Sequence, residues 1–549
     1  MTHWLILPIL LPAMLAATMI LVARYHMMIQ RVFSVVGTLA VFCLAAGLFW
    51  QASDGTVSLY LLGNWSAPFG IVLVADRLST LMVLMTATLA LPVLLYAIGS
   101  GWDARGKHFH PLFQFQLMGI IGAFLTGDAF NLFVFFEVLL IASYGLMIHA
   151  GGSKRLRAGT QYVLYNLLGS TLFLFALGAI YAETGTLNMA DLAVRVATLE
   201  AADSAGIRVA AVLLLMVFAV KAAILPLHFW LPASYAEAPA PVAALFAIMT
   251  KVGAYCIIRI FTLVFPPDLE ITQGLFDVWL MPAALLTVAL GMLGVLGAKS
   301  VDRMVAFSVI GSMGMLLAAV AVFTQTGITA ALYYAVHSTF AAAALFLLVD
   351  VIRSRRGAAA VSFDVAPPIA GGALVAGMFF VAAIAMTGLP PLSGFIGKLL
   401  ILDAARSSDL MWWAWATILV GSLVAVVGFA RAGSVVFWKA HQPTDKRPTQ
   451  MAAEDAEPQN TSVLPMVSIG ALLALLIGLT VAAGPVTRVL SATSAQLFNP
   501  ETYIAVVLTT QGKQINSDYD TYGDNKEDPE EGSDGADTTD GSNLTEKDN

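Results

Sequence analysis

The stretch Val217-Phe-Ala-Val-Lys221-Ala-Ala-Ile-Leu-Pro226 places a lysine and a proline inside one long apolar run. A run of about 20 apolar residues is long enough to cross a lipid bilayer as a helix. Proline removes a backbone N–H donor, and inside a membrane the freed backbone groups must be satisfied by protein or water. The sequence therefore predicts a membrane helix that is broken at Pro226, beside a hydrated cavity.

A second apolar run repeats this combination in Gly388-Leu-Pro-Pro-Leu-Ser-Gly394-Phe-Ile-Gly397-Lys398. Here we expect the helix to break at Pro390, Pro391 and Gly394. A Ser-Thr pair lies in the aromatic-rich run that precedes each break, at Ser170-Thr171 and at Ser338-Thr339. This matching order predicts two units of five helices. Because five is an odd number, consecutive units must have opposite orientations in the membrane.

The whole chain has the composition of a membrane protein. Of its 549 residues, 59% are hydrophobic and 11% are charged, whereas soluble proteins are roughly 45–50% apolar and about 25% charged. This composition excludes a soluble multidomain enzyme. We expect an all-α polytopic membrane protein with about fourteen transmembrane helices. The expected spans lie near residues 4–23, 32–50, 71–98, 111–126, 129–149, 160–182, 207–231, 239–265, 278–297, 304–324, 329–352, 370–402, 411–438 and 463–483.

The pattern of apolar runs divides the chain into predicted parts. These are an N-terminal three-helix segment (1–110), a first five-helix repeat (111–265), a second five-helix repeat (278–438), a polar linker (439–462), a final transmembrane helix with its flank (463–510) and an acidic tail (511–549). The tail holds twelve acidic and three basic residues, so its net charge is −9 and the rest of the chain carries +2 of the total −7. This polar, acidic composition predicts a disordered tail. The polar stretch Asn188–Ser204 predicts a short helix at the surface.

Basic residues gather in alternate loops and predict the orientation of the chain. One set of loops holds fifteen of them and the opposite set holds three: Arg195, Arg208 and Arg406. By the positive-inside rule, both termini are expected to be extracytoplasmic. The fifteen are Arg24, Arg31, Arg105, Lys107, Lys154, Arg155, Arg157, Lys299, Arg303, Arg353, Arg355, Arg356, Lys439, Lys446 and Arg447.

The ends and the cysteines give further expectations. The first apolar run starts at Trp4 without a basic region before it, which favours a retained helix over a cleaved signal. Cys43 and Cys256 each lie inside an apolar run and predict neither a disulfide framework nor an iron–sulfur site. We also expect no metal site, no bound cofactor and no nucleic-acid binding, because no motif for them occurs.

Ionisable residues inside the spans are the candidate functional residues. Each central charge costs roughly 2.5–3.5 kcal/mol to insert, so each needs a partner, water or a function. Glu137 is expected to pair with Lys221, either as a static ion pair or as part of a proton pathway. His228 shares a face with Lys221 if the helix stays regular, and it is either a proton relay or a structural histidine. Lys251, His337 and Lys398 continue this line, which predicts a chain of proton sites, whereas Arg259 and Arg431 are expected to be structural.

Four of these stretches resemble the antiporter-like subunits shared by Mrp-type cation/proton antiporters and respiratory complex I. They are Asn131-Leu-Phe-Val-Phe-Phe-Glu137, Lys221-Ala-Ala-Ile-Leu-Pro-Leu-His228-Phe-Trp-Leu-Pro232, Lys251-Val-Gly and Gly388 to Lys398. The resemblance covers about residues 1–485. It implies two inverted five-helix repeats, each with one broken helix. It also implies proton transfer through Glu137, Lys221, Lys251 and Lys398, with His228 and His337 nearby.

Within this superfamily, the stretch from Leu62 to Ser79 looks like the D-type subunit of Mrp antiporters. The expected function is thus proton translocation in a multisubunit Na⁺/H⁺ or other monovalent cation/proton antiporter of a bacterial inner membrane, with A, B, C, E, F and G-type subunits as partners. Such a chain is a secondary transporter subunit rather than an enzyme. Two alternatives stay open: a proton-pumping membrane subunit of NADH:quinone oxidoreductase (complex I) or a related oxidoreductase, and a scaffold with an inactive channel.

Overall fold

The computed structural model describes residues 3–199, 205–366, 368–369, 371–439 and 463–512. Residues 3–512 belong to one compact unit. The predicted disordered tail and most of the predicted polar linker lie outside the described residues, as do Lys446 and Arg447.

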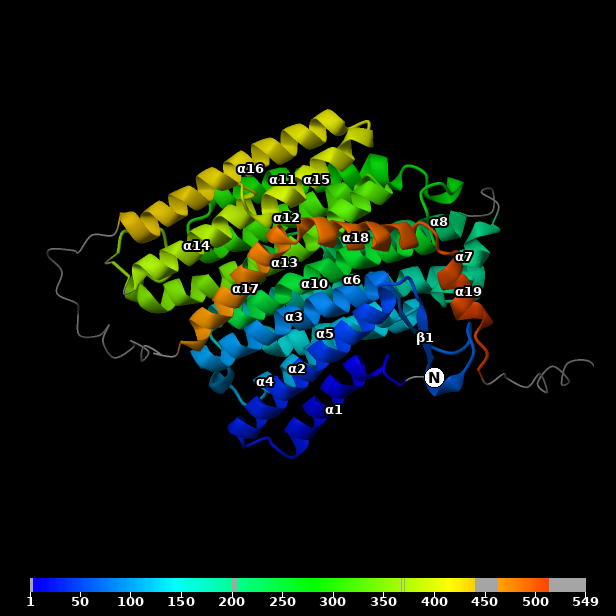
Figure 1. Cartoon of the computed structure of the whole chain (residues 1–549), viewed down its shortest axis with the longest axis horizontal. Helices are drawn as coiled ribbons and strands as arrows, with labels where there is room; N and C mark the ends of the chain where they lie inside the picture. Colours follow the sequence, from blue (N-terminus) through cyan, green and yellow to red (C-terminus); the bar gives the residue numbers. More distant parts are fainter. Residues whose placement is uncertain (1–2, 200–204, 367, 370, 440–462, 513–549) are drawn as a thin grey trace, which may run out of the picture. The chain divides into compact units, whose positions relative to one another are not determined.

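The fold is almost entirely helical (Figure 1). The longer helices are α1 (Leu7–Leu21), α2 (Met27–Ala52), α3 (Arg77–Ser100), α4 (Phe109–Leu125), α5 (Ala129–Met147), α6 (Ser153–Thr184), α7 (Met189–Ala197), α8 (Ala205–Lys221), α9 (Trp230–Glu237), α10 (Ala240–Leu263), α11 (Met281–Gly297), α12 (Val301–Ala321), α13 (Gln325–Arg355), α14 (Gly372–Thr387), α15 (Ser393–Ala404), α16 (Met411–Gly433), α17 (Leu464–Val481), α18 (Ala483–Leu497) and α19 (Glu501–Thr509). Short 3₁₀ or π turns occupy Leu62–Asn64, Asp103–Arg105, Glu270–Thr272, Leu275–Leu280, Gly357–Ala359, Ala405–Ser407 and Ser434–Trp438.

Every predicted span overlaps a helix of the structure, and the spans 207–231 and 370–402 each include the break between two successive helices. Among the described residues, ten helices are long and apolar enough to cross a membrane, and α1, α4 and α14 are shorter apolar helices. The chain is therefore a multi-pass membrane protein, and the number of fourteen crossings stays a prediction. The predicted surface helix is present as α7, although residues 200–204 are not described.

One predicted boundary is wrong, because the expected span 71–98 begins with a strand. Strand β1 (Ser58–Leu61) pairs with β2 (Val72–Ala75) as an antiparallel hairpin, with Ser58 opposite Ala75. Helix α3 starts only after Asp76, whose side chain accepts a hydrogen bond from the Ser79 backbone while the Ser79 hydroxyl accepts one from the Asp76 backbone. This reciprocal cap satisfies two of the backbone donors at the helix start and so fixes the boundary.

The two ends of the bundle carry different structures. At one end α19 contacts both α7 and strand β1 of the hairpin (Figure 1). The opposite end gathers the basic loops: Arg31 pairs with Asp103, Arg353 pairs with Asp302, and Arg155 stacks on Trp102. Burial raises the pKa of Asp103, but hydrogen bonds from His110 and Arg31 outweigh burial and hold that pKa below its ordinary value. Asp103 therefore supplies a fixed negative charge within this basic end.

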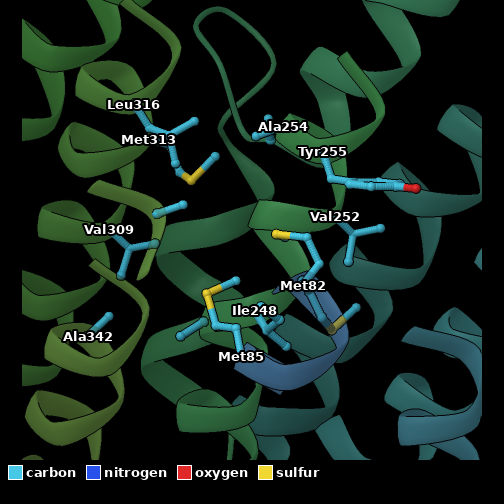
Figure 2. Close-up of a cluster of buried hydrophobic side chains, with 14 of the residues drawn as sticks. Met82, Met85, Ile248, Val252, Ala254, Tyr255, Val309, Met313, Leu316 and Ala342 are labelled. Atoms are coloured by element: carbon cyan, nitrogen blue, oxygen red, sulfur yellow. The ribbon is translucent and has the colours of Figure 1, made fainter. Parts of the chain in front are cut away.

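Helix α10 lies at the centre of the core. All 24 of its residues are buried. Figure 2 shows the apolar cluster around it, in which Ile248 and Val252 of α10 meet Met82 and Met85 of α3 on one side. Val309 and Met313 of α12 lie on the other side. A polar side chain on α10 is thus far from solvent unless the bundle provides a hydrated path.

Candidate functional site

The first broken helix ends at Lys221 and resumes at Trp230. Pro226 therefore lies in the break, as expected, and the helix already ends five residues before it. Two side chains take up freed backbone groups: the Trp230 indole donates to the Val220 carbonyl over 3.0 Å, and the Thr287 hydroxyl of α11 accepts from the Leu225 backbone over 2.9 Å. The break is thus stabilised by protein groups in the way that a helix interrupted within a membrane requires.

Lys221 is the last residue of α8 and is 5% exposed. Its ammonium donates to the Asn166 side-chain oxygen over 3.2 Å and to the Asn166 carbonyl over 3.5 Å. It also lies 5.7 Å from the centre of the Phe136 ring. Both hydrogen bonds are long for a charged donor. The buried Lys221 is therefore bound only weakly, and by a neutral residue.

The expected ion pair between Glu137 and Lys221 is not formed. Among the described residues no ion pair joins them, and the buried Oε1 of Glu137 has no hydrogen-bond partner. The reason is the turn of α5: successive residues point about 100° apart around a helix. Phe136 therefore faces Lys221, and Glu137 lies beside it, half-buried and still within electrostatic range.

His228 lies in the turn between α8 and α9, so the condition for a face shared with Lys221 does not hold. Its side chain is 9% exposed, and its Nδ1 has no hydrogen-bond partner in the described part of the chain. The ring lies against Phe229, with centroids 4.5 Å apart. His228 is thus near the break but is not connected to Lys221 by a hydrogen bond among these residues.

Lys251 is fully buried on α10, and within the described ranges its Nζ makes no hydrogen bond. Its position is fixed by Gly253, two residues later. A Cβ at Gly253 would lie 2.8 Å from the Ala222 nitrogen and 2.9 Å from the Phe218 carbonyl oxygen of α8. The absence of a side chain there lets α10 touch the last turn of α8, and this brings the backbones at Lys251 and Lys221 close together.

His337 is fully buried on α13. Its Nδ1 lies 2.9 Å from the Ser393 hydroxyl of α15, and its Nε2 has no hydrogen-bond partner among the described residues. The ring lies within electrostatic range of both Lys398 and Lys251. His337 therefore stands between the centre of the core and the second break.

The second broken helix ends at Thr387 and resumes at Ser393, so Pro390 and Pro391 lie in the break as expected. Gly394 does not, because it is the second residue of α15. A side chain there would overlap the Ala385 carbonyl oxygen, so its role is close packing. Gly388 makes the turn instead, with a φ of +77°, a conformation that glycine adopts without steric cost.

Lys398 is 5% exposed and is firmly held. Its ammonium donates to the Thr387 carbonyl over 2.5 Å and to the Ser422 hydroxyl of α16 over 2.8 Å. Thr387 is the last residue of α14, so Lys398 binds the negative end of a half-helix. The same contact satisfies a carbonyl that the break sets free.

The structure thus brings the predicted residues into two groups. Glu137 and Lys221 form the first, Lys251, His337 and Lys398 form the second, and the contact at Gly253 joins α8 to α10 between them. Three buried polar atoms of these groups have no partner among the described residues: Oε1 of Glu137, Nζ of Lys251 and Nε2 of His337. Leaving such an atom unpaired costs about 1–3 kcal/mol, so the arrangement favours water or a transferable proton at these positions.

The two arginines inside predicted spans both contact other parts of the chain, Arg259 from a buried position and Arg431 from an exposed one. Arg259 forms a bidentate pair with Asp76, both bonds being 2.7 Å, and lies over the ring of Tyr503 in α19. Arg431 donates to the Ala298 carbonyl at the end of α11 over 2.7 Å. The pair between Asp76 and Arg259 ties α3 to α10; it was not predicted, although a carboxylate at the start of an apolar run is a signal that could have found it.

Other residues of the site were not predicted from the sequence. Asn166, Ser393 and Ser422 supply the polar contacts of Lys221, His337 and Lys398. Asn166 could have been found, because a buried amide in the middle of a span needs a partner as a charge does. Serine gives no such signal, because a serine hydroxyl often bonds to its own helix.

No group of three or more His, Cys, Asp or Glu side chains in the described ranges is placed to hold a metal ion. The expected absence of a metal or cofactor stays a prediction.

Comparison with known proteins places this geometry in a family. Residues 126–425 match the model described as NADH:quinone oxidoreductase/Mrp antiporter, TM. The chain is 40% identical to the D-type subunit of a probable K(+)/H(+) antiporter from Rhizobium meliloti (strain 1021), over 92% of this chain and 98% of that protein. It is 38% identical to the D-type subunit of the Na(+)/H(+) antiporter from Bacillus subtilis (strain 168), over 92% and 100%. A chain in the structure of the Mrp complex from Dietzia sp. DQ12-45-1b is 28% identical, with a TM-score of 0.81 over 92% of this chain and 100% of that chain.

Proposed function

The chain belongs to the NADH:quinone oxidoreductase/Mrp antiporter family, and on this premise we propose that it is the proton-translocating D-type subunit of a multisubunit monovalent cation/proton antiporter. The proton gradient drives the exchange, with Na⁺ or another monovalent cation as the counter-ion. Similarity to D-type antiporter subunits over almost their full length supports this function. The chain is a transporter subunit rather than an enzyme, and other Mrp-type subunits are its partners.

The observation that carries the proton-transfer role is the set of buried ionisable groups with unpaired atoms at and between two helix breaks. A neutral lysine or histidine nitrogen accepts a proton, and its charged form donates one. Lys221, Lys251, His337 and Lys398 lie on α8, α10, α13 and α15, which contact one another in that order. Glu137 lies on α5, whose Phe136 contacts Lys221. A scaffold with an inactive channel would have no reason to bear the insertion cost of these groups.

We propose the following sequence of charge changes. A proton that binds Glu137 removes the negative charge near Lys221 and so makes its ammonium form less stable. Lys221 then gives its proton to the next site, Lys251, which passes it through His337 to Lys398. His228 lies in the first break and is the proposed proton relay there. Each step moves one proton, and each change of charge biases the neighbouring site.

The proposal also covers the organisation of the chain. We propose that 111–265 and 278–438 are two inverted five-helix units, with 1–110 as an N-terminal three-helix segment, 439–462 as a linker and 463–510 as the closing helix with its flank. The matching order of the two breaks supports the repeat. The protein is placed in a bacterial inner membrane with the basic end of the bundle inside. Both termini, including the acidic tail from 511, are then extracytoplasmic.

The test is sodium-dependent proton flux in everted membrane vesicles from an antiporter-deficient host, without NADH. The host expresses this chain together with its neighbouring genes. Glu137→Gln removes the charge and keeps the side-chain volume. We expect sodium-induced loss of the proton gradient for the native chain and a roughly tenfold or greater reduction for the variant, since about 1.4 kcal/mol of lost electrostatic coupling corresponds to tenfold.

Glu270→Gln is the matched control, because Glu270 is exposed outside the long helices. It should transport as the native chain does. Full activity of Glu137→Gln with normal assembly would contradict the role of Glu137. A flux that appears only when an electron donor is supplied would instead assign the chain to an oxidoreductase of the complex I type.

A further inference from the structure

A cavity of about 360 Å³ lies where α18 crosses the ends of α2 and α3. Its walls include Phe49 of α2, Arg77 of α3, and Pro485, Arg488 and Val489 of α18. The volume is at the lower end of the range for small-molecule sites, about 300–1,000 Å³. The cavity lies at the end of the bundle that carries the β1–β2 hairpin.

The polar part of the cavity is cationic. Arg77 donates from Nη2 to the Ser53 carbonyl over 2.8 Å and from Nε to the Ala52 carbonyl over 3.4 Å, and its Nη1 makes no hydrogen bond with a described residue. Arg488 makes no hydrogen bond or ion pair with any residue that the structure describes. The nearby carboxylate is Asp54, which accepts a 2.8 Å hydrogen bond from the Thr56 backbone. The two guanidinium groups therefore outnumber the carboxylates facing them.

The rest of the cavity lining is mainly apolar, with the hydroxyls of Ser53 and Thr493 beside Phe49, Pro485, Val489 and Ala492. Below Arg77, one face of α3 carries a partly exposed stripe at helical spacing, made of Leu84, Thr88, Leu91, Leu95 and Ile98. The Thr88 hydroxyl bonds to the Leu84 carbonyl, so this stripe presents no free polar group. Helices α2 and α17 both pack on α3 (Figure 1). The stripe is thus an apolar strip on a helix that crosses the membrane.

Helix α18 is fixed over the cavity by polar contacts that are independent of any ligand. The Gln496 side chain donates to the Gly55 carbonyl over 3.0 Å and accepts from the Arg77 backbone over 3.1 Å. The Ser494 hydroxyl donates to the Gln325 carbonyl over 2.8 Å. The cavity is therefore preformed, which lowers the entropic cost of binding.

We propose that this cavity binds the phosphodiester headgroup of an anionic phospholipid, with an acyl chain along the α3 stripe. Guanidinium groups bind phosphate oxygens through paired, charge-assisted hydrogen bonds. The apolar stripe favours a lipid over free phosphate, because it gives a hydrocarbon chain a surface that an inorganic ion cannot use. The bound lipid fastens α18 to α2 and α3.

The test uses the purified multisubunit complex in mild detergent after removal of bound lipid. Its thermal midpoint is followed while dioleoylphosphatidylglycerol is added, with inorganic phosphate and dioleoylphosphatidylcholine added in parallel. A ligand that binds only the folded state raises the midpoint in proportion to its affinity. We expect phosphatidylglycerol to raise the midpoint of the native complex at concentrations where phosphate has no effect.

Two variants and one control locate the site. Arg488→Gln should need roughly tenfold more phosphatidylglycerol for the same shift, as expected for loss of a charge-assisted contact. Ala492→Phe fills the cavity without changing its charge and should abolish the shift. Arg208→Gln alters an exposed arginine of α8 outside the cavity and should behave as the native chain.

Three outcomes would overturn the proposal. The first is an unchanged response of both Arg488→Gln and Ala492→Phe, which would place the lipid elsewhere or a partner subunit over the cavity. The second is an equal shift with inorganic phosphate, which would assign a free anion. The third is an equal response to phosphatidylcholine, which would show that the charge of the headgroup does not determine binding.

Discussion

The break between α8 and α9 and the break between α14 and α15 each free a backbone carbonyl inside the bundle, but different side chains take it up. At the first break the Trp230 indole binds the Val220 carbonyl, and Lys221 is left with the neutral Asn166 at 3.2 and 3.5 Å. At the second break Lys398 itself binds the Thr387 carbonyl at 2.5 Å and Ser422 at 2.8 Å. The same chemical group is thus a weakly held cation in one place and part of the helix break in the other.

This difference separates charge transfer from structural support. A buried ammonium with long hydrogen bonds loses little when it changes its protonation or its partner. One that satisfies a broken backbone loses two contacts at once. We therefore expect the first break to tolerate substitution of its lysine structurally, and the second break to be destabilised by it.

The residues that make the two turns also differ, and substitution of the one at the second break is expected to have the largest effect on stability. Ala223 at the first break has a φ of +55° although it carries a Cβ, whereas Gly388 at the second has a φ of +77°. A Cβ on Gly388 would lie 2.5 Å from Cδ of Lys398. Gly388→Ala should therefore cost about 2–5 kcal/mol, from backbone strain of about 1–2 kcal/mol and overpacking of about 1–3 kcal/mol.

The measurement is the thermal midpoint of the purified complex, with Gly377→Ala as control. Gly377 lies in the same half-helix, and a Cβ there meets nothing within 4 Å. In the double variant Gly388→Ala, Lys398→Ala the overpacking part should disappear, which a double-mutant cycle detects as coupling. Additive effects would show that Lys398 does not limit the space at Gly388.

The second prediction compares the two lysines directly. Replacing either lysine by methionine keeps most of the side-chain volume and removes a buried charge. Both variants therefore avoid the cost of desolvating an ammonium group. Lys398→Met also leaves the Thr387 carbonyl without its donor and should be less stable than Lys221→Met by about 1–3 kcal/mol. Both should lose sodium-dependent proton flux.

Stability is read from thermal melting and transport from the vesicle assay, on the same preparations. If Lys221→Met proves the less stable of the two, the assignment of a supporting role to the second break is wrong. If Lys221→Met keeps full flux, its place in the proton pathway is wrong while the structural comparison stands.

Sequence patterns predict the helices and both breaks because each depends on local properties, namely the length of an apolar run and the missing donor of proline. The ionisable residues are also found, because each is costly in a membrane wherever it points. The partner of Lys221 is not found, because whether Phe136 or Glu137 faces it depends on the rotation of α5 within the bundle. The strand at Val72–Ala75 is missed for a similar reason, since a short apolar run reads alike as a strand or as the start of a helix.

The smallest expected effect on stability concerns the group that binds the free Val220 carbonyl at the first break. Trp230→Phe removes the donor to the Val220 carbonyl while keeping an aromatic ring in the cluster with Tyr162 and Tyr235. The expected cost is about 1–2 kcal/mol for an unsatisfied buried carbonyl, seen as a lower thermal midpoint. Lys221 is next to Val220 in sequence and is the cation available to bind the vacated carbonyl.

Trp415→Phe is the matched control, because its indole donates to the Leu402 carbonyl over 2.8 Å near the end of α15. It should cost a similar free energy without affecting transport. Trp230→Phe should also lower sodium-dependent proton flux. In this variant Lys221 can bind the Val220 carbonyl, as Lys398 binds the Thr387 carbonyl, and it then releases its proton less readily. Equal flux in the two variants would mean that the weak holding of Lys221 does not depend on Trp230.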